Sequence, residues 1–149
     1  MRRSRVLLLL MAGAAMTGSI GCKQEKGATE ANGKGGVSWE ISFGAGMKDA
    51  AEAGKPTIVE FYTDWCGWCK RLDRDVFERP DVAEAAQDFI CIKVNGDKYP
   101  ERVAKFKIVA LPTVVFTDPT GKEVARIEGY KRARDFRKTI RKVKEDLGK

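Results

Sequence analysis

The feature that most constrains this chain is a pair of cysteines that follows closely on a strongly apolar run. Residues 57–62 (Thr-Ile-Val-Glu-Phe-Tyr) are mostly β-branched or aromatic, a composition that predicts a buried strand. Cys66 and Cys69 follow shortly after it, where the next helix is expected to begin. Unpaired backbone N–H groups and the helix dipole stabilise a thiolate at a helix N-terminus. The placement therefore predicts that Cys66 is a nucleophile and that Cys69, one turn further into the helix, resolves the mixed disulfide.

A Cys-x-x-Cys pair also occurs in zinc sites, structural disulfides and copper carriers. The chain has no histidine, and beyond the pair it has only Cys22 and Cys91. Because Cys22 belongs to the predicted tether, four zinc ligands are not expected to come together in the domain, which argues against a structural zinc site. A disulfide that closes so short a loop removes little entropy from the unfolded chain, and a domain of this length needs no such staple. Copper(I) delivery by two soft thiolates stays an alternative, although no methionine lies beside the pair. The prediction is redox chemistry at Cys66 and Cys69, with no metal and no cofactor.

From Val37 onward the pattern is that of a folded α/β domain. We expect strands at residues 57–62, 89–94, 114–116 and 123–127, and helices at residues 47–53, from Cys66 to Pro80, at 82–87 with Asp81 as the cap, at 100–106 and at 136–147. This order of elements predicts one mixed sheet with helices on both faces. Cys91 alternates with Ile90 and Ile92 in the second strand and is expected to be a buried, inert thiol.

The start of the chain has a different character. A basic segment is followed by an apolar run from Val6 to Met16, which is too short to span a membrane and is typical of an export signal. Its end, Ser19-Ile20-Gly21-Cys22, resembles the lipobox of bacterial lipoproteins, in which the cysteine is lipidated; a plain secretory signal is the alternative. The residues that follow are polar and glycine-rich, which predicts a flexible tether. We therefore expect a signal peptide at residues 1–21, a tether at 22–36 and one domain at 37–149.

The charge of the chain is uneven. The formal net charge is +7, and residues 131–149 alone hold nine basic and three acidic residues. This excess sits on one terminal helix without interleaved aromatic stacking residues, which argues against nucleic-acid binding. The basic face of the helix is expected to be solvated, and attraction to anionic lipid headgroups is the functional alternative. Its cations are Arg134, Arg137, Lys138, Arg141 and Lys142.

Two stretches carry a resemblance to a known family. Residues 54–70 (Gly-Lys-Pro-Thr-Ile-Val-Glu-Phe-Tyr-Thr-Asp-Trp-Cys-Gly-Trp-Cys-Lys) and residues 110–113 (Ala-Leu-Pro-Thr), with Gly129 after the last strand, are similar to the signature of the thioredoxin superfamily. The similarity extends to exported thioredoxin-like proteins and to the C-terminal domain of the transmembrane thiol:disulfide interchange reductase. It implies a thioredoxin-like fold and a thiol:disulfide oxidoreductase that acts on protein disulfides, as a reductant or isomerase in the bacterial cell envelope. We expect a monomer that faces the periplasm, anchored by lipid, and that exchanges electrons with a membrane-embedded or other redox partner.

The resemblance also assigns roles to polar residues around the cysteines. It implies a redox-active disulfide between Cys66 and Cys69. Glu60 corresponds to a buried acid that relays protons to Cys69. A carboxyl in so apolar a strand should lose hydration, which raises its pKa, and a solvent-facing Glu60 is the alternative. Lys93 falls where the family keeps a lysine close to that acid, with a solvated surface lysine as the alternative.

Substrate binding is implied for residues beside the pair. Pro112 corresponds to the family's cis-proline, and the backbone before it pairs with an extended substrate segment. Trp65, Trp68 and Leu111 are expected to form an apolar docking surface, with packing beneath the helix as the alternative for Trp65. Trp68 replaces a residue that is often proline or histidine in relatives, so strong oxidant behaviour is not expected. A redox-inert module that holds client peptides at Pro112 is the rival from another functional class.

Overall fold

The computed structural model describes residues 29–30 and 35–148 of the chain. Its elements, in chain order, are β1 (Thr29–Glu30), β2 (Trp39–Glu40), α1 (Phe43–Ala53), β3 (Thr57–Tyr62), α2 (Gly67–Leu72), the π-helical turn η1 (Asp73–Phe77), α3 (Pro80–Ala86), β4 (Ile90–Asn95), α4 (Pro100–Lys105), β5 (Thr113–Thr117), β6 (Glu123–Glu128) and α5 (Ala133–Asp146). The short connection 63–66 joins β3 to α2. The two cysteines therefore lie at the carboxyl end of β3.

The strands form one sheet in the order β1-β2-β4-β3-β5-β6. β3 lies between β4, to which it runs parallel, and β5, to which it runs antiparallel. β2 joins β4 in parallel, and the two edge strands β1 and β6 are antiparallel to their neighbours. This arrangement confirms the predicted mixed sheet. β1 extends the sheet into residues that the sequence assigns to the tether.

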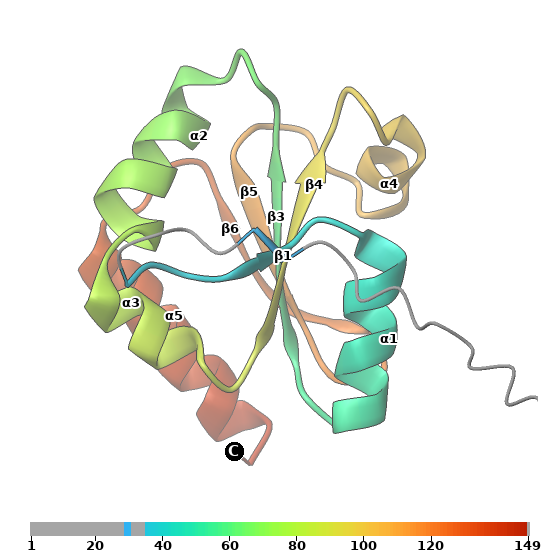
Figure 1. The fold of residues 1–149 in the computed structure, drawn as a ribbon, viewed down its shortest axis with the longest axis vertical. Coiled ribbons are helices and arrows are strands. Elements are labelled where there is room, and N and C mark those ends of the chain that lie inside the picture. The colour runs from blue at the N-terminus through green and yellow to red at the C-terminus, as the bar shows by residue number, and fades with distance from the viewer. Residues whose placement is uncertain (1–28, 31–34, 149) are drawn as a thin grey trace, which may run out of the picture.

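Helices cover both faces of the sheet, as Figure 1 shows: α1 and α4 lie on one side, and α2, α3 and α5 lie on the other. Each face has its own apolar core. Ile58 and Phe77 belong to the core beneath α2, α3 and α5, whereas Val59 and Phe61 belong to the core beneath α1 and α4. Because side chains alternate along a strand, Glu60 points to the same side as Ile58, toward the layer that contains α2. β3 is thus buried on both faces, as predicted.

The helix predicted from Cys66 to Pro80 is divided in the structure. α2 passes into the turn η1, and Pro80 then occupies the first position of α3, where its fixed φ and its missing N–H suit a helix start. The cap predicted at Asp81 is wrong. Arg79 is the N-cap residue, and the Asp81 carboxylate in the first turn accepts a hydrogen bond of 2.9 Å from Arg79 Nε. α3 therefore begins at Pro80, earlier than the pattern of apolar residues indicates.

Near the start of the domain, the structure has a longer first helix than predicted and one additional short strand. α1 begins at Phe43, earlier than predicted, because the Ser42 hydroxyl accepts a hydrogen bond of 3.3 Å from the Ala45 N–H and caps the helix. β2 was not predicted, since two residues are too few to show a period. Trp39 of β2 packs edge-to-face on Phe77, with ring centroids 4.8 Å apart. This contact joins the start of the domain to η1.

The residue expected to be an inert core thiol is Cys91. It lies buried in β4, and burial raises its pKa to about 12. The structure thus confirms the predicted burial of Cys91, and a thiol with so high a pKa stays protonated at neutral pH.

The predicted signal peptide, Cys22 and most of the predicted tether lie outside the described residues. Among the helices of residues 35–148, none combines the length and the apolar character that crossing a membrane requires.

Candidate active site at the start of α2

Cys66 and Cys69 are joined by a disulfide bond at the N-terminus of α2, with their Cα atoms 5.3 Å apart. Cys66 is the N-cap residue, and its Sγ accepts a hydrogen bond of 3.1 Å from the Cys69 N–H. The two side chains differ in access, since Cys66 is 6% exposed and Cys69 is 1% exposed. In the reduced pair, this N–H would stabilise a negative charge on the more accessible sulfur.

An apolar groove of about 500 Å³ opens beside Cys66. Its walls include Trp65, Trp68, Asp97 after β4, and residues 108–111 between α4 and β5. Trp65 is 72% exposed and Trp68 is 56% exposed, so Trp65 does not pack beneath the helix. Its indole Nε1 instead donates a hydrogen bond of 2.8 Å to the Asp97 carboxylate. The structure thus brings both tryptophans together with Leu111 along one groove next to the disulfide.

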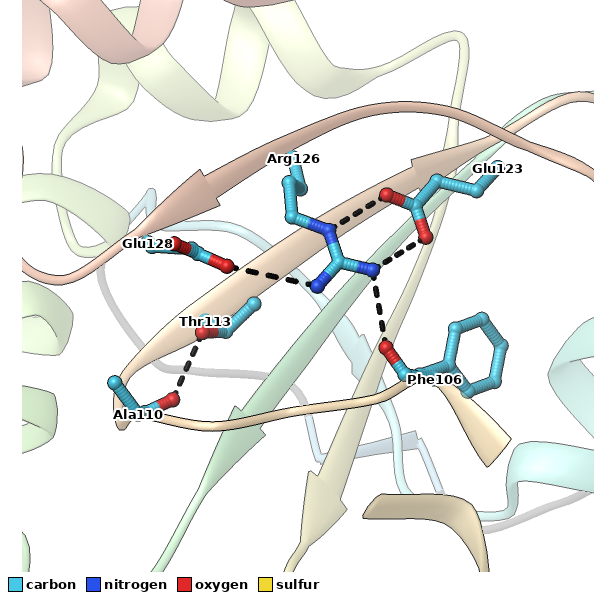
Figure 2. A network of polar contacts seen from close by, with 6 residues as sticks. All are labelled: Phe106, Ala110, Thr113, Glu123, Arg126 and Glu128. Carbon is cyan, nitrogen blue, oxygen red and sulfur yellow. Dashed lines mark hydrogen bonds and ion pairs between the residues drawn. The ribbon is translucent and has the colours of Figure 1, made fainter. Parts of the chain in front are cut away.

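The loop between α4 and β5 ends in a cis peptide bond between Leu111 and Pro112. Leu111 lines the groove, and Pro112 is buried. Thr113 Oγ1 donates a hydrogen bond of 2.8 Å to the carbonyl oxygen of Ala110 (Figure 2), and the Gly129 N–H donates one of 2.8 Å to that of Pro112. Gly129 has a φ of 72°, a conformation that favours glycine. We call this loop, residues 107–112, the groove wall. Hydrogen bonds on both sides of Pro112 therefore fix its C-terminal end.

The other end of this loop is held by Arg126 of β6, a residue that the sequence analysis did not single out. Arg126 Nη2 donates a hydrogen bond of 3.0 Å to the carbonyl oxygen of Phe106, where α4 ends (Figure 2). Glu123 holds the guanidinium with two hydrogen bonds of 2.6 and 2.7 Å, and a Glu128 oxygen lies 3.6 Å from Nη1. Arg126 therefore ties the start of the groove wall to the edge strand of the sheet.

Glu60 lies on β3 and is fully buried, which excludes the solvent-facing alternative. Among the described residues, neither of its carboxylate oxygens receives a hydrogen bond, and Lys93 Nζ lies 3.4 Å from Oε2. The pairing follows from the sheet register, in which Glu60 stands opposite Lys93 of β4. Burial raises the pKa of Glu60 to about 8, and the Lys93 ammonium limits the rise.

Lys93 is not a solvated surface lysine, because it has a second partner in Asp73, the first residue of η1. Lys93 Nζ lies 2.5 Å from Asp73 Oδ1 and over the rings of Trp39 and Tyr62, at 5.3 and 5.2 Å from their centroids. Burial alone would lower the pKa of Lys93, but the charges of Glu60 and Asp73 raise it. The lysine therefore stays charged between two carboxyl groups, one buried and one partly exposed.

These groups define what the site can do chemically. Two cysteines that form a disulfide can cycle between dithiol and disulfide and exchange electrons with another disulfide. A buried carboxyl with a pKa of about 8 can accept or release a proton near neutral pH. Within residues 29–30 and 35–148, no three Cys, His, Asp or Glu side chains are grouped so that they could hold a metal ion.

Comparison with known proteins places this arrangement in a family. A family model described as a thioredoxin-like domain matches residues 43–144, more than half of the chain. The chain belongs to the thioredoxin-like domain family. The solution structure of a thioredoxin from Thermus thermophilus superposes with a TM-score of 0.66 at 24% identity, over 72% of this chain and 87% of that chain. This superposition confirms the predicted thioredoxin-like fold.

Two relatives are similar to this chain in sequence. The chloroplast thioredoxin-like protein HCF164 of Arabidopsis thaliana is 31% identical over 103 residues, which cover 62% of this chain and 40% of the relative. The thiol:disulfide interchange protein DsbD of Vibrio vulnificus (strain CMCP6) is 31% identical over 100 residues, which cover 63% of this chain and 17% of the relative. The chain thus spans well under two thirds of the length of these relatives.

Proposed function

We propose that this thioredoxin-like chain exchanges thiols and disulfides with other proteins, with Cys66 as the nucleophile and Cys69 as the resolving thiol. The observation that carries the proposal is the disulfide at the N-terminus of α2, beside an apolar groove. The family match and the thiol:disulfide interchange protein among the relatives support it. The substrates are protein disulfides that can reach Cys66 through the groove.

In the reductive direction, the Cys66 thiolate attacks one sulfur of the substrate disulfide. A bond forms between the two sulfurs, and the other substrate sulfur leaves as a thiolate. Cys69 then loses its proton and attacks the Cys66 sulfur, which closes the Cys66–Cys69 disulfide and releases the second substrate sulfur. The substrate gains two electrons and the chain loses two, so a dithiol of a partner protein must return them.

We assign the proton transfer of the second step to Glu60. Its side chain points from β3 toward the layer that contains the helix of Cys69. Because Glu60 is fully buried, its carboxyl does not exchange protons directly with solvent. A pKa of about 8 leaves part of the carboxyl ionised at neutral pH, able to take the proton of Cys69. Lys93 joins Glu60 to Asp73, whose side chain is 29% exposed, and this gives the proton a route to solvent.

A reductant or isomerase role fits this site better than that of a primary oxidant. Strong oxidants owe their potential to extra stabilisation of the nucleophilic thiolate. Here the residue before Cys69 is Trp68, and the chain contains no histidine that could add a positive charge beside the thiolate. Among the described residues, the hydrogen bond that Cys66 Sγ accepts comes from the Cys69 N–H.

The proposed function is tested by turnover of a protein disulfide, with insulin as substrate and dithiothreitol as electron source. The wild type should accelerate insulin reduction, and the double variant Cys66→Ser/Cys69→Ser should not. Cys91→Ala is the matched control and should behave like the wild type, because Cys91 is a buried thiol in β4 away from the groove. A double variant as fast as the wild type would refute the proposal and favour a redox-inert client-binding module.

Arg126→Ala tests the role of the groove wall. The variant removes the donor to the Phe106 carbonyl, so residues 107–112 should become less ordered. Substrate binding should then lose more conformational entropy, because it has to order this loop. We expect KM for insulin to rise about 3- to 10-fold, as for the loss of about 1 kcal/mol, while kcat changes little. Arg79→Ala, which breaks an exposed ion pair on α3, is the control. An unchanged KM would show that Arg126 does not position the wall.

We further propose that the chain is a lipoprotein of the bacterial cell envelope, held by a lipid on Cys22 and facing the periplasm. The apolar run of residues 6–16 and the sequence up to Cys22 support an export signal at residues 1–21. The tether of residues 22–36 would then hold a monomeric domain, residues 37–149, close to the membrane, where a membrane-embedded redox partner can return its electrons.

Cys22→Ala should convert the exported protein from membrane-bound to soluble. A thioether-linked diacylglycerol provides two acyl chains, which suffice for stable anchoring where one does not. Membrane and soluble fractions are compared for the wild type, Cys22→Ala and the control Cys91→Ala, which should stay with the membrane. Wild-type protein in the soluble fraction, without lipid mass on Cys22, would contradict the anchor.

A further inference from the structure

A cluster of aromatic and basic side chains surrounds Trp68 beside the disulfide. The Arg71 guanidinium carbon lies 5.3 Å from the centroid of the Trp68 ring and 5.1 Å from that of Tyr130. The two rings are themselves 5.8 Å apart. Asp75 accepts a hydrogen bond of 3.2 Å from Arg71 Nε. Arg71 is therefore held next to the redox-active pair while its two Nη groups are left for other contacts.

Trp68 and Tyr130 belong to two different segments, α2–η1 and the residues just before α5, and both segments carry further cations. We call the exposed side chains Lys70, Arg71, Arg74, Lys131 and Arg132 the basic rim. Tyr130 links the two segments, since its hydroxyl donates a hydrogen bond of 3.5 Å to Asp75. Asp75 also pairs with both arginines of α2–η1, and for the other three cations no carboxylate partner is found among the described residues. The basic rim thus carries a clear excess of positive charge.

Among the described residues that line the groove, the one charged side chain is that of Asp97. Asp97 lines the groove and accepts the hydrogen bond of Trp65. Asp64, also exposed, accepts a hydrogen bond of 3.2 Å from Asn95 Nδ2. The charge around Cys66 is therefore uneven, with the cations of the basic rim on one side and the Asp97 carboxylate in the groove on the other.

We propose that the basic rim recognises an acidic segment next to the target disulfide of a partner protein. This inference rests on the proposed function, because it names which protein disulfides the site prefers. Charges of one sign beside a reactive group raise the association rate of an oppositely charged partner and suppress the wrong orientation. Arg71 adds geometry, since a guanidinium already fixed by two rings and Asp75 can bind a carboxylate at little entropic cost.

A protein segment fits this surface better than a lipid headgroup. The basic rim borders Cys66 through Trp68, so a membrane pressed onto it would cover the sulfur that must be attacked. An extended acidic peptide can contact the rim and still leave its own disulfide over Cys66. The Asp97 carboxylate in the groove would repel an anionic bilayer as well.

The test uses two synthetic peptides, each with one intramolecular disulfide, that differ only in carrying three Glu or three Lys residues on each side of it. The rate constant kcat/KM for their reduction is measured at 20 mM and 500 mM salt. The wild type should reduce the Glu peptide about 10-fold faster than the Lys peptide at 20 mM salt. At 500 mM salt the ratio should fall to less than about 2, because charges are screened within a few ångströms.

The variant Lys131→Glu/Arg132→Glu reverses two charges of the basic rim and should remove the preference for the Glu peptide at 20 mM salt. Arg141→Glu/Lys142→Glu is the matched control, since it makes the same change of charge ten residues further along the chain, within α5. The control should keep the preference of the wild type. Thermal melting of both variants shows whether they are folded.

The outcomes separate this inference from the proposed function. If neither peptide is reduced by the wild type, the proposed function fails. If both peptides are reduced at equal rates at 20 mM salt, the function stands and the recognition of acidic segments is overturned. Equal rates, together with retention of the Cys22→Ala chain on vesicles with 30% phosphatidylglycerol that is lost in the rim variant, would assign the surface to lipid instead.

Discussion

The Cys66→Ser variant is expected to lose protein-disulfide reduction by at least about three orders of magnitude, because it removes the atom that forms the covalent intermediate. The Cys69→Ser variant is expected to accumulate mixed disulfides between Cys66 and its substrates. It keeps the backbone N–H that donates to Cys66 Sγ, so the first step proceeds, but the thiol of the second step is gone. Non-reducing electrophoresis and intact mass detect the trapped species.

The two single variants check each other. Cys66→Ser should trap no partner, because Cys69 is 1% exposed and no substrate sulfur can reach it. If Cys66→Ser trapped mixed disulfides and Cys69→Ser did not, the roles of the two thiols would be reversed.

The Glu60→Gln variant is expected to slow turnover about 100-fold at pH 7 and to flatten its dependence on pH. The amide keeps the size of the side chain but cannot take the proton of Cys69, the contribution that general base catalysis makes. Alkylation of Cys66 at neutral pH should change little, because its hydrogen bond comes from the Cys69 N–H. Identical pH profiles of turnover for the wild type and Glu60→Gln would show that Glu60 is not the proton relay.

The same variant has a predicted effect on stability. The pKa of Glu60 in the folded chain, about 8, lies above its ordinary value of 4.5. Between these values the native state holds a proton that the unfolded state releases, so this group makes the free energy of unfolding fall as pH rises from 4.5 to about 8. Glu60→Gln removes this loss and should gain most over the wild type at pH 8 and above. Thermal melting of both proteins from pH 5 to pH 9 measures the difference. A lower melting temperature of the variant at pH 8 would show instead that the negative charge of Glu60 stabilises the fold through its ion pair with Lys93.

Two neighbouring variants should shift the pH profile of turnover in opposite directions. Lys93→Gln removes the cation that lowers the pKa of Glu60, so the profile should move to higher pH. Asp73→Asn removes an anion that raises this pKa, so the profile should move to lower pH. Shifts in one common direction, or none, would show that another group controls the profile.

The sequence was most informative where buried apolar residues and a motif coincide. The strand at residues 57–62 was predicted with its observed bounds, because β-branched residues point to both faces and no polar face blurs the pattern. The same pattern gave the burial of Glu60, since a carboxyl between Val59 and Phe61 has no exposed face to occupy. Pairing of Glu60 with Lys93 needed the strand register, which only the fold of the whole sheet determines.

Other site residues depend on contacts that are distant in sequence. Asp73 follows Cys69 by four residues, one turn along a helix, and that spacing could have drawn attention to it. A polar residue in the middle of a helix is ordinarily solvated, however, and its partner Lys93 is on another strand. Arg126 stands in a charged strand that resembles any exposed edge, and its contact with the Phe106 carbonyl arises only when β6 lies beside the end of α4.

The central claim, that Cys66 and Cys69 form a redox-active pair, is tested most directly by equilibrating the protein with glutathione buffers of defined ratio. The fluorescence of Trp65, which precedes Cys66, and of Trp68, which lies between the two cysteines, reports the state of the disulfide. We predict one reversible two-electron transition that is absent in Cys66→Ser, with a midpoint between about −270 and −180 mV, the range of reductants and isomerases. A pair that stays oxidised or reduced across all buffers, with no reversible transition, would contradict the account.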